Sequence, residues 1–141
     1  MADATIEPPR IFPTMRYADA GRMIDWLQQA FGFIVHARYG EGGRVDHAQL
    51  SFGSSMIMLG SDRDDAFCKI VGSPGQPGGK AIYVAVANVD AVHARAVAAG
   101  ATIEEPPTDR DYGSREFICR DPEGNIWSFG TYYPKAHEKD G

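Results

Sequence analysis

Apolar residues in the first half of the chain recur at the spacing of a helix and are flanked by strand-like runs. Leu27 and Phe31 lie four residues apart within a helix predicted over roughly 20–30. Asp19 suits the N-cap of this helix, and Gly32 suits a left-handed residue that ends it. Strands are predicted on either side of the helix, at 11–17, 33–39, 45–52 and 55–59, the last two forming a hairpin around Gly53-Ser54.

The second half of the chain predicts the same order of elements. Asn88 is the expected N-cap of a helix that Gly100 ends. Asp19 and Asn88 are about 70 residues apart, and so are Met58 and Ser128, which indicates an internal repeat. Strands are predicted at 81–86 and 101–105 and, after a loop at 106–113, in a closing hairpin whose turn is Asp121-Pro122-Glu123-Gly124.

The segment between the two halves has no apolar periodicity. Residues 61–79 are charged at first and then rich in glycine and proline, and we interpret them as a linker. The 141 residues fit one domain with a single core. We therefore predict an α+β domain built from two βαβββ modules, at about 10–60 and 80–133.

The composition of the chain limits the kinds of molecule that it is expected to bind. The net charge of −5 and the lack of a Lys/Arg stripe argue against nucleic acid, while a negative charge mildly favours cationic small molecules. No signal-peptide pattern opens the chain and no apolar run is long enough for a membrane span, so a cytoplasmic protein with no membrane partner is expected. Cys68 and Cys119 are interpreted as reduced thiols.

Several motifs together resemble the vicinal oxygen chelate superfamily, which includes glyoxalases, bleomycin-resistance proteins and extradiol dioxygenases. They cover most of residues 10–133, and the chain is most similar to its small PhnB-like glyoxalase-like branch. The resemblance implies two modules whose curved sheets enclose a cleft, commonly in a homodimer. The motifs are Met15-Arg16-Tyr17-Ala18-Asp19, Ala30-Phe31-Gly32-Phe33, His47-Ala48-Gln49-Leu50, Val86-Ala87-Asn88-Val89-Asp90, Ala98-Ala99-Gly100-Ala101 and Asp121-Pro122-Glu123-Gly124-Asn125.

In metal-using relatives, the ligands lie on the first and last strand of each module. The matching positions here are Phe12, Met58, Ala81 and Ser128. Phenylalanine and alanine cannot bind a metal, a thioether is too soft for Mg²⁺, Mn²⁺ or Fe²⁺, and a neutral hydroxyl is a poor ligand. We therefore expect no metal at these positions and no cofactor.

Strand alternation predicts which side chains face the cleft. Ala48 and Leu50 are apolar and suit packing against the helix, which turns the alternate residues of that strand to the cleft. An apolar wall with a few polar groups is typical of a small-molecule site. The expected ligand-binding residues are Phe12, Arg16, His47, Gln49, Met58, Tyr83, Glu116 and Ser128.

Two functions remain open at this point. The first is metal-free binding of a small organic molecule, as in the bleomycin-resistance branch. The alternative is a lyase, isomerase or dioxygenase with a divalent metal on a displaced set, His47, Gln49 and Glu116. Structural roles are also open, since His47 suits a satisfied strand histidine and Arg16 with Glu116 suits an ion pair.

Overall fold

The computed structural model describes residues 7–74 and 78–135, and the chain divides into two compact units, 1–74 and 75–141. Each unit contains one four-stranded mixed sheet with a helix packed on one face, which is the predicted α+β, βαβββ arrangement. Of the helices within the described residues, none has the length and apolarity that a membrane span requires.

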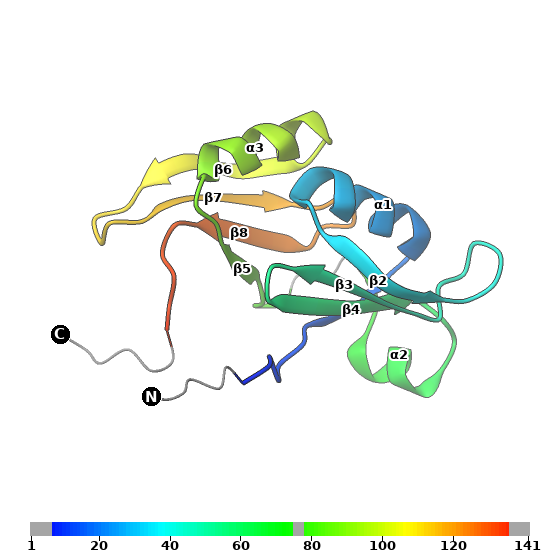
Figure 1. Ribbon diagram of the computed structural model, residues 1–141. Helices are drawn as coiled ribbons and strands as arrows, with labels where there is room; N and C mark the ends of the chain where they lie inside the picture. The colour runs from blue at the N-terminus through cyan, green and yellow to red at the C-terminus, as the bar shows by residue number, and fades with distance from the viewer. Residues whose placement is uncertain (1–6, 75–77, 136–141) are drawn as a thin grey trace. The chain divides into compact units, whose positions relative to one another are not determined.

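Unit 1 contains the first sheet, with the strand order β1-β4-β3-β2 (Figure 1). β1 runs parallel to β4, and the other neighbouring strands are antiparallel. Its elements are β1 (Thr14–Tyr17), α1 (Ala20–Phe31), β2 (Ile34–Tyr39), β3 (His47–Phe52), β4 (Ser55–Ser61) and α2 (Ala66–Val71).

Helix α1 begins and ends where the sequence predicts. The Asp19 carboxylate accepts a hydrogen bond from the Arg22 backbone N–H at 3.2 Å, and Gly32 adopts φ 87°, the left-handed conformation that a glycine tolerates. Because one side of α1 is apolar, it packs on the sheet, and its buried residues are Ala20, Met23, Ile24, Trp26, Leu27, Ala30 and Phe31.

The hairpin of β3 and β4 fixes which side chains face α1. Phe52 pairs with Ser55 across the turn, as predicted, and Gln49 pairs with Met58. Ala48 and Leu50 are fully buried. The alternate residues of both strands therefore lie on the opposite face of the sheet.

The segment 61–79 is not entirely loop, because it contains the short helix α2. The Asp65 carboxylate accepts a hydrogen bond from the Cys68 backbone N–H at 2.8 Å and caps this helix. The guanidinium of Arg63 donates to the backbone carbonyls of Val45 and Asp46 and so ties the segment to the start of β3. Six helical residues are too few to show periodicity, which is why the sequence did not predict them, and positions 75–77 lie outside the described residues.

Unit 2 repeats the order of unit 1, with the strand order β5-β8-β7-β6 (Figure 1). Thr14 pairs with Met58 in unit 1, and Tyr83 pairs with Ser128 in unit 2, so the predicted repeat holds at the level of strand register. The elements are β5 (Ile82–Ala85), α3 (Val89–Ala98), β6 (Thr102–Asp109), β7 (Arg115–Arg120) and β8 (Ile126–Gly130).

The predicted turn between β7 and β8 is held by Asp121, which is 3% exposed. Its carboxylate accepts hydrogen bonds from the backbone N–H groups of Glu123 and Asn125 and from the indole of Trp127. Gly124 adopts φ 91°. One buried carboxylate therefore satisfies the donors of the turn and of the strand after it.

Strand β6 is longer than predicted. The sequence indicates a strand that ends at Glu105 followed by a loop, yet β6 continues through Pro106 and Pro107 to Asp109. β6 is the edge strand of its sheet, and its pairing with β7 shifts register between Glu105 and Thr108. Prolines are tolerated there because the ladder does not require their missing N–H groups.

Candidate functional site

The predicted site residues lie on the face of each sheet turned away from α1 or α3 (the site face). In unit 1 the strand register aligns Thr14, Met58 and Gln49 on three neighbouring strands. Arg16 lies two residues after Thr14 on β1, so the same alternation turns it to this face. The structure thus brings together four of the unit 1 residues predicted from the sequence, Arg16, His47, Gln49 and Met58, whereas Phe12 precedes β1 and strand alternation does not place it.

A short polar chain runs along this face. The His47 Nε2 atom lies 3.1 Å from the Gln49 Oε1 atom, and the Gln49 amide nitrogen lies 3.6 Å from the Met56 sulfur. The ring of Tyr39 stacks on the His47 ring, with centroids 6.4 Å apart. The first contact orients both polar side chains, so each has a fixed direction before any ligand arrives.

His36 is a polar residue near this face to which the sequence assigned no role. Its Nε2 atom lies 2.8 Å from the Ser51 hydroxyl. The register of β2 shifts between Val35 and Ala37, which makes His36 the extra residue of a bulge. A bulge has no sequence signature in this strand, so simple alternation could not place His36.

Arg16 is the cation of the unit 1 site face. Its guanidinium carbon lies 4.7 Å from the centroid of the Phe67 ring on α2, within the range of a cation–π contact. A Cβ added at Gly60 would lie 2.6 Å from a terminal nitrogen of Arg16, so the guanidinium packs closely against a glycine. The Arg16 Nε atom is buried and has no hydrogen-bond acceptor among the described residues.

On the unit 2 site face, Glu116 is 9% exposed and strongly hydrogen-bonded. Its carboxylate accepts from the Tyr112 hydroxyl at 2.8 Å and from Arg110 at 3.2 Å, and Arg110 also pairs with Glu105. Burial raises the pKa of the Glu116 carboxyl, whereas hydrogen bonds from Tyr112, Ser114 and Arg110 lower it. The hydrogen bonds have the larger effect, so the pKa of Glu116 lies below its ordinary value. Glu116 therefore already has a cationic partner, Arg110, within its own unit.

Tyr83 and Ser128 share this face with Glu116. The strand register places Ile118 beside Ser128 and Glu116 beside Gly130, which confirms the predicted parity of β7. The Tyr83 hydroxyl donates to the Tyr132 backbone carbonyl at 2.6 Å. Burial raises the pKa of the Tyr83 phenol above its ordinary value, so this hydroxyl is a neutral donor.

The strand register also refines the positions considered for a metal. Thr14 rather than Phe12 lies directly beside Met58, and Tyr83 rather than Ala81 lies directly beside Ser128. Neutral hydroxyls and a thioether are weak donors for a hard divalent ion. Within the described residues, no group of three or more His, Cys, Asp or Glu side chains has the geometry to hold a metal.

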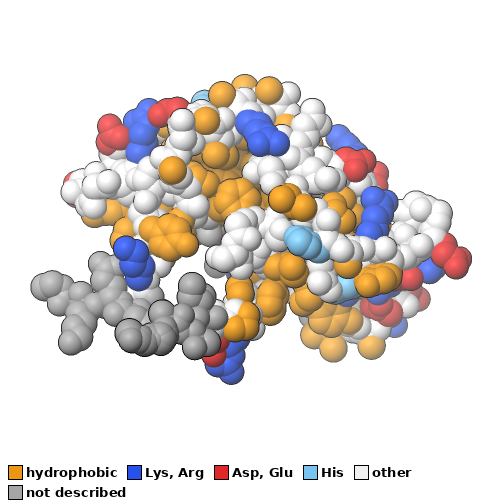
Figure 2. Space-filling model, in the orientation of Figure 1, with side chains coloured by type: hydrophobic (Ala, Val, Ile, Leu, Met, Phe, Trp, Pro, Cys, Tyr) orange, Lys and Arg blue, Asp and Glu red, His pale blue; other side chains and the backbone are white. Residues whose placement is uncertain are grey.

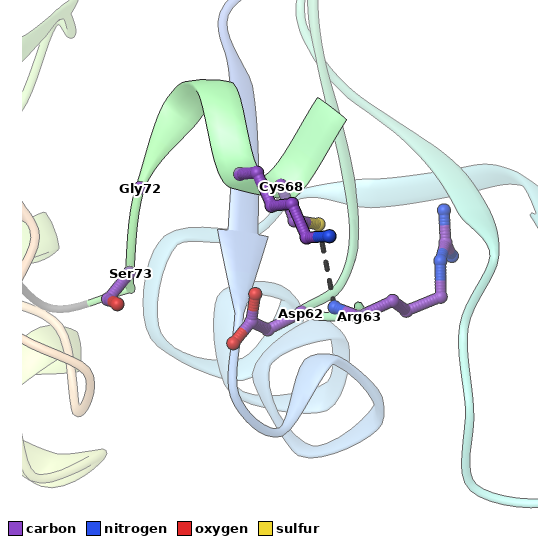
Figure 3. Close-up of a pocket in the computed structure, with 6 residues that line it drawn as sticks. Asp62, Arg63, Cys68, Gly72 and Ser73 are labelled. Atoms are coloured by element: carbon purple, nitrogen blue, oxygen red, sulfur yellow. Dashed lines mark hydrogen bonds between the residues drawn. The ribbon is translucent and has the colours of Figure 1, made fainter. Parts of the chain in front are cut away.

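A small hollow beside α2 has a different character (Figure 3). It is lined by Asp62, Arg63, Cys68, Lys69, Gly72 and Ser73. The Cys68 sulfur accepts a hydrogen bond from the Arg63 backbone N–H, and the Arg63 side chain is held by Asp65 and Asp46. These contacts stabilise the segment itself.

The charges on the molecular surface are mixed. Figure 2 shows acidic and basic side chains scattered among one another on the visible face, with hydrophobic side chains between them. Most arginines with a described partner pair with a nearby carboxylate, as Arg115 does with Asp90 and Asp109, and Arg120 with Glu104. Within residues 7–74, the part of unit 1 that the structure describes, no ion pair involves Arg16, which separates it from these arginines.

Comparison with known proteins identifies the family. Residues 11–129 match the Glyoxalase/Bleomycin resistance protein/Dioxygenase superfamily. Uncharacterised proteins of Mycobacterium bovis and Mycobacterium tuberculosis are each 32% identical over 125 residues, which covers 86% of this chain and 82% and 74% of those proteins.

Solved structures agree with this assignment. TioX from Micromonospora sp. ML1 has a TM-score of 0.70 at 31% identity, covering 86% of this chain and 94% of that chain. A glyoxalase/bleomycin resistance protein/dioxygenase family enzyme from Burkholderia phytofirmans PsJN shares the fold, with a TM-score of 0.66 at 22% identity over 85% of this chain and 94% of that chain. The chain therefore belongs to the glyoxalase/bleomycin resistance protein/dioxygenase superfamily.

Proposed function

We propose that this protein binds a small organic molecule and does so without a metal ion. The observation that carries the proposal is the composition of the unit 1 site face. Met56 and Met58 supply apolar surface there, while Arg16, His47 and Gln49 supply polar groups at defined positions. A mainly apolar surface with a few oriented polar groups recognises an organic ligand by shape and by a small number of hydrogen bonds.

The side chains on the first and last strands of each unit also favour ligand binding without a metal. The residues beside one another on the first and last strands are Thr14 with Met58 and Tyr83 with Ser128. Three neutral hydroxyls and a thioether supply no negative charge to a divalent cation. They therefore compensate a divalent cation for little of the free energy that it loses when it leaves water. Binding of an organic ligand needs only the hydrogen bonds that these groups form in their neutral state.

The competing function is an enzyme with a metal on His47, Gln49 and Glu116. Glu116 already accepts hydrogen bonds from Arg110 and Tyr112, and His47 and Gln49 bond to each other. A metal on this set would have to replace each of these contacts. For this reason we favour binding over metal-dependent catalysis.

Metal analysis of protein purified without chelators, from medium supplemented with Mn, Fe, Ni and Zn, tests the proposal. We expect well below one equivalent of metal per chain and a melting temperature that EDTA leaves unchanged, because a ligand specific for the folded state would raise it. His47→Ala and Met58→Ala should give the same low metal content. Stoichiometric metal that is lost in His47→Ala alone would establish the displaced-site enzyme instead.

A further inference from the structure

We infer that the ligand carries a carboxylate on an apolar body, and that Arg16 binds this carboxylate while Phe67 holds the guanidinium in place. The inference rests on the proposed function and names the chemical class of its ligand. It depends on the close contact of Arg16 with two elements of unit 1: the glycine surface of β4 at Gly60 and the ring of Phe67 on α2.

The first observation is that Arg16 lacks a counter-ion within unit 1. Arg63, on the same unit, pairs with both Asp46 and Asp65, whereas no carboxylate among residues 7–74 lies within ion-pair distance of Arg16. A half-buried guanidinium without a carboxylate is unusual because its charge has lost part of its hydration. An anionic ligand would supply the missing charge.

The second observation is the buried Nε–H group, which has no acceptor among the described residues. A buried N–H group without an acceptor destabilises the folded protein, and an acceptor on the ligand would remove this destabilisation. Neighbouring protein atoms cover the Nε–H group. A carboxylate that displaces this cover accepts from Nε–H and one terminal nitrogen together, in the planar fork geometry that arginine offers. The donor is already dehydrated, so its bond to the ligand costs little further desolvation.

The third observation is that the guanidinium is already oriented. Its central carbon lies 4.7 Å from the Phe67 centroid and a terminal nitrogen packs against Gly60, so contacts with two elements restrict its position. A pre-oriented side chain loses less rotamer freedom when the ligand binds. Met58 on the same face then offers apolar contact to the body of the acid. The net charge of −5 opposes an anion only at long range, where salt screens it.

The test compares two probes of one shape, 2-naphthoate and its neutral amide, 2-naphthamide, by calorimetric titration. A charge-assisted pair is expected to make the acid bind about tenfold to a hundredfold tighter than the amide. Arg16→Gln should abolish the preference, and Arg16→Lys should keep only part of it because a point charge cannot form the side-on pair. Arg22→Gln, an exposed change on α1, should keep the full preference.

A second measurement is independent of variant stability. In ¹⁵N-labelled wild-type protein, the Nε–Hε resonance of Arg16 should shift on addition of 2-naphthoate and stay unchanged with 2-naphthamide. Equal affinity for the two probes would overturn this inference and leave small-molecule binding standing. Preference for the acid that persists in Arg16→Gln would also overturn it, and failure of both probes to bind would count against the inference and the proposed function together.

Discussion

A terminal nitrogen of Arg16 packs so closely over Gly60 that a Cβ at position 60 would lie 2.6 Å from it. The equivalent glycine of unit 2 has the same role. A Cβ at Gly130 would lie 2.6 Å from the Tyr83 hydroxyl and 2.7 Å from a side-chain carbon of Glu116. In both units the last strand therefore carries a glycine where a side chain of the site face packs closely against the sheet.

Substituting Gly60 tests this packing directly. Gly60→Ala should destabilise the protein by about 1–3 kcal/mol, because the added carbon meets the backbone carbonyl of Asp46 at 2.9 Å as well as Arg16. Gly43→Ala is the matched control, since a Cβ there meets nothing within 4 Å, and its effect should stay within about 0.5 kcal/mol. Urea unfolding measures both, and equal effects would show that Gly60 has room for a side chain.

The two faces of β3 should respond differently to truncation. Leu50 is fully buried against α1, so Leu50→Ala should cost about 2–5 kcal/mol of unfolding free energy. His47 lies on the site face, and His47→Ala should cost less than about 1 kcal/mol. Chemical denaturation of the two variants gives the comparison. A larger loss for His47→Ala would mean that the strand faces the other way.

Removing the contact between Phe67 and Arg16 should weaken ligand binding without a large loss of unfolding free energy. Phe67→Ala removes the ring that orients the guanidinium, and a contact of this kind contributes about 0.5–1 kcal/mol at an exposed site. Binding of 2-naphthoate should weaken by a factor of about 2–5. Ile70→Ala, on the same helix and 82% exposed, should leave the affinity unchanged. A similar loss in both variants would indicate that α2 acts as a whole rather than through the ring.

Glu116 should make stability depend on pH in the acid range. Its pKa is lowered in the folded protein, so its contribution is present above the ordinary carboxyl pKa and is lost as the pH falls through the folded value. Between about pH 6 and pH 3, the wild type should therefore lose more stability than Glu116→Gln. Glu41→Gln, an exposed loop change, should follow the wild-type curve. Parallel curves for Glu116→Gln and the wild type would exclude a lowered pKa.

The buried thiol of Cys119 gives a further check on unit 2. Burial among Phe117, Trp127 and their neighbours, with Asp121 nearby, raises the pKa of Cys119 to about 12. The thiolate is then nearly absent at pH 8, and a thiol reagent should modify Cys119 only at the rate of unfolding. Rapid modification of the folded protein would show that β7 is accessible.

The local part of the fold was readable from the sequence. Asp19 and Gly32 marked the ends of α1, and Gly53-Ser54 fixed the register in which Phe52 meets Ser55. Short-range rules sufficed for these features because each depends on neighbouring residues. The same rules placed His47, Gln49 and Met58 on one face, since alternation follows directly from the pleat.

Features that depend on contacts between distant segments could not be predicted. Nothing in the sequence places Phe67 against Arg16, because α2 is too short to show a pattern and the contact is made in three dimensions. The pairing of Glu116 with Arg110 was likewise not predicted, because it depends on how β6 and β7 meet. The continuation of β6 through Pro106 is possible because β6 is the edge strand of its sheet, and local sequence propensities do not show which strand is at the edge.

Metal-free ligand binding on the unit 1 site face can be tested by a single titration. ¹⁵N-labelled protein treated with EDTA is titrated with 2-naphthoate, and its amide and arginine resonances are followed. We expect saturable shifts at the Arg16 Nε–H and the Gln49 side-chain amide, with the α1 amides unchanged. Shifts that are absent in EDTA and appear only after Zn²⁺ is added would rule out metal-free binding.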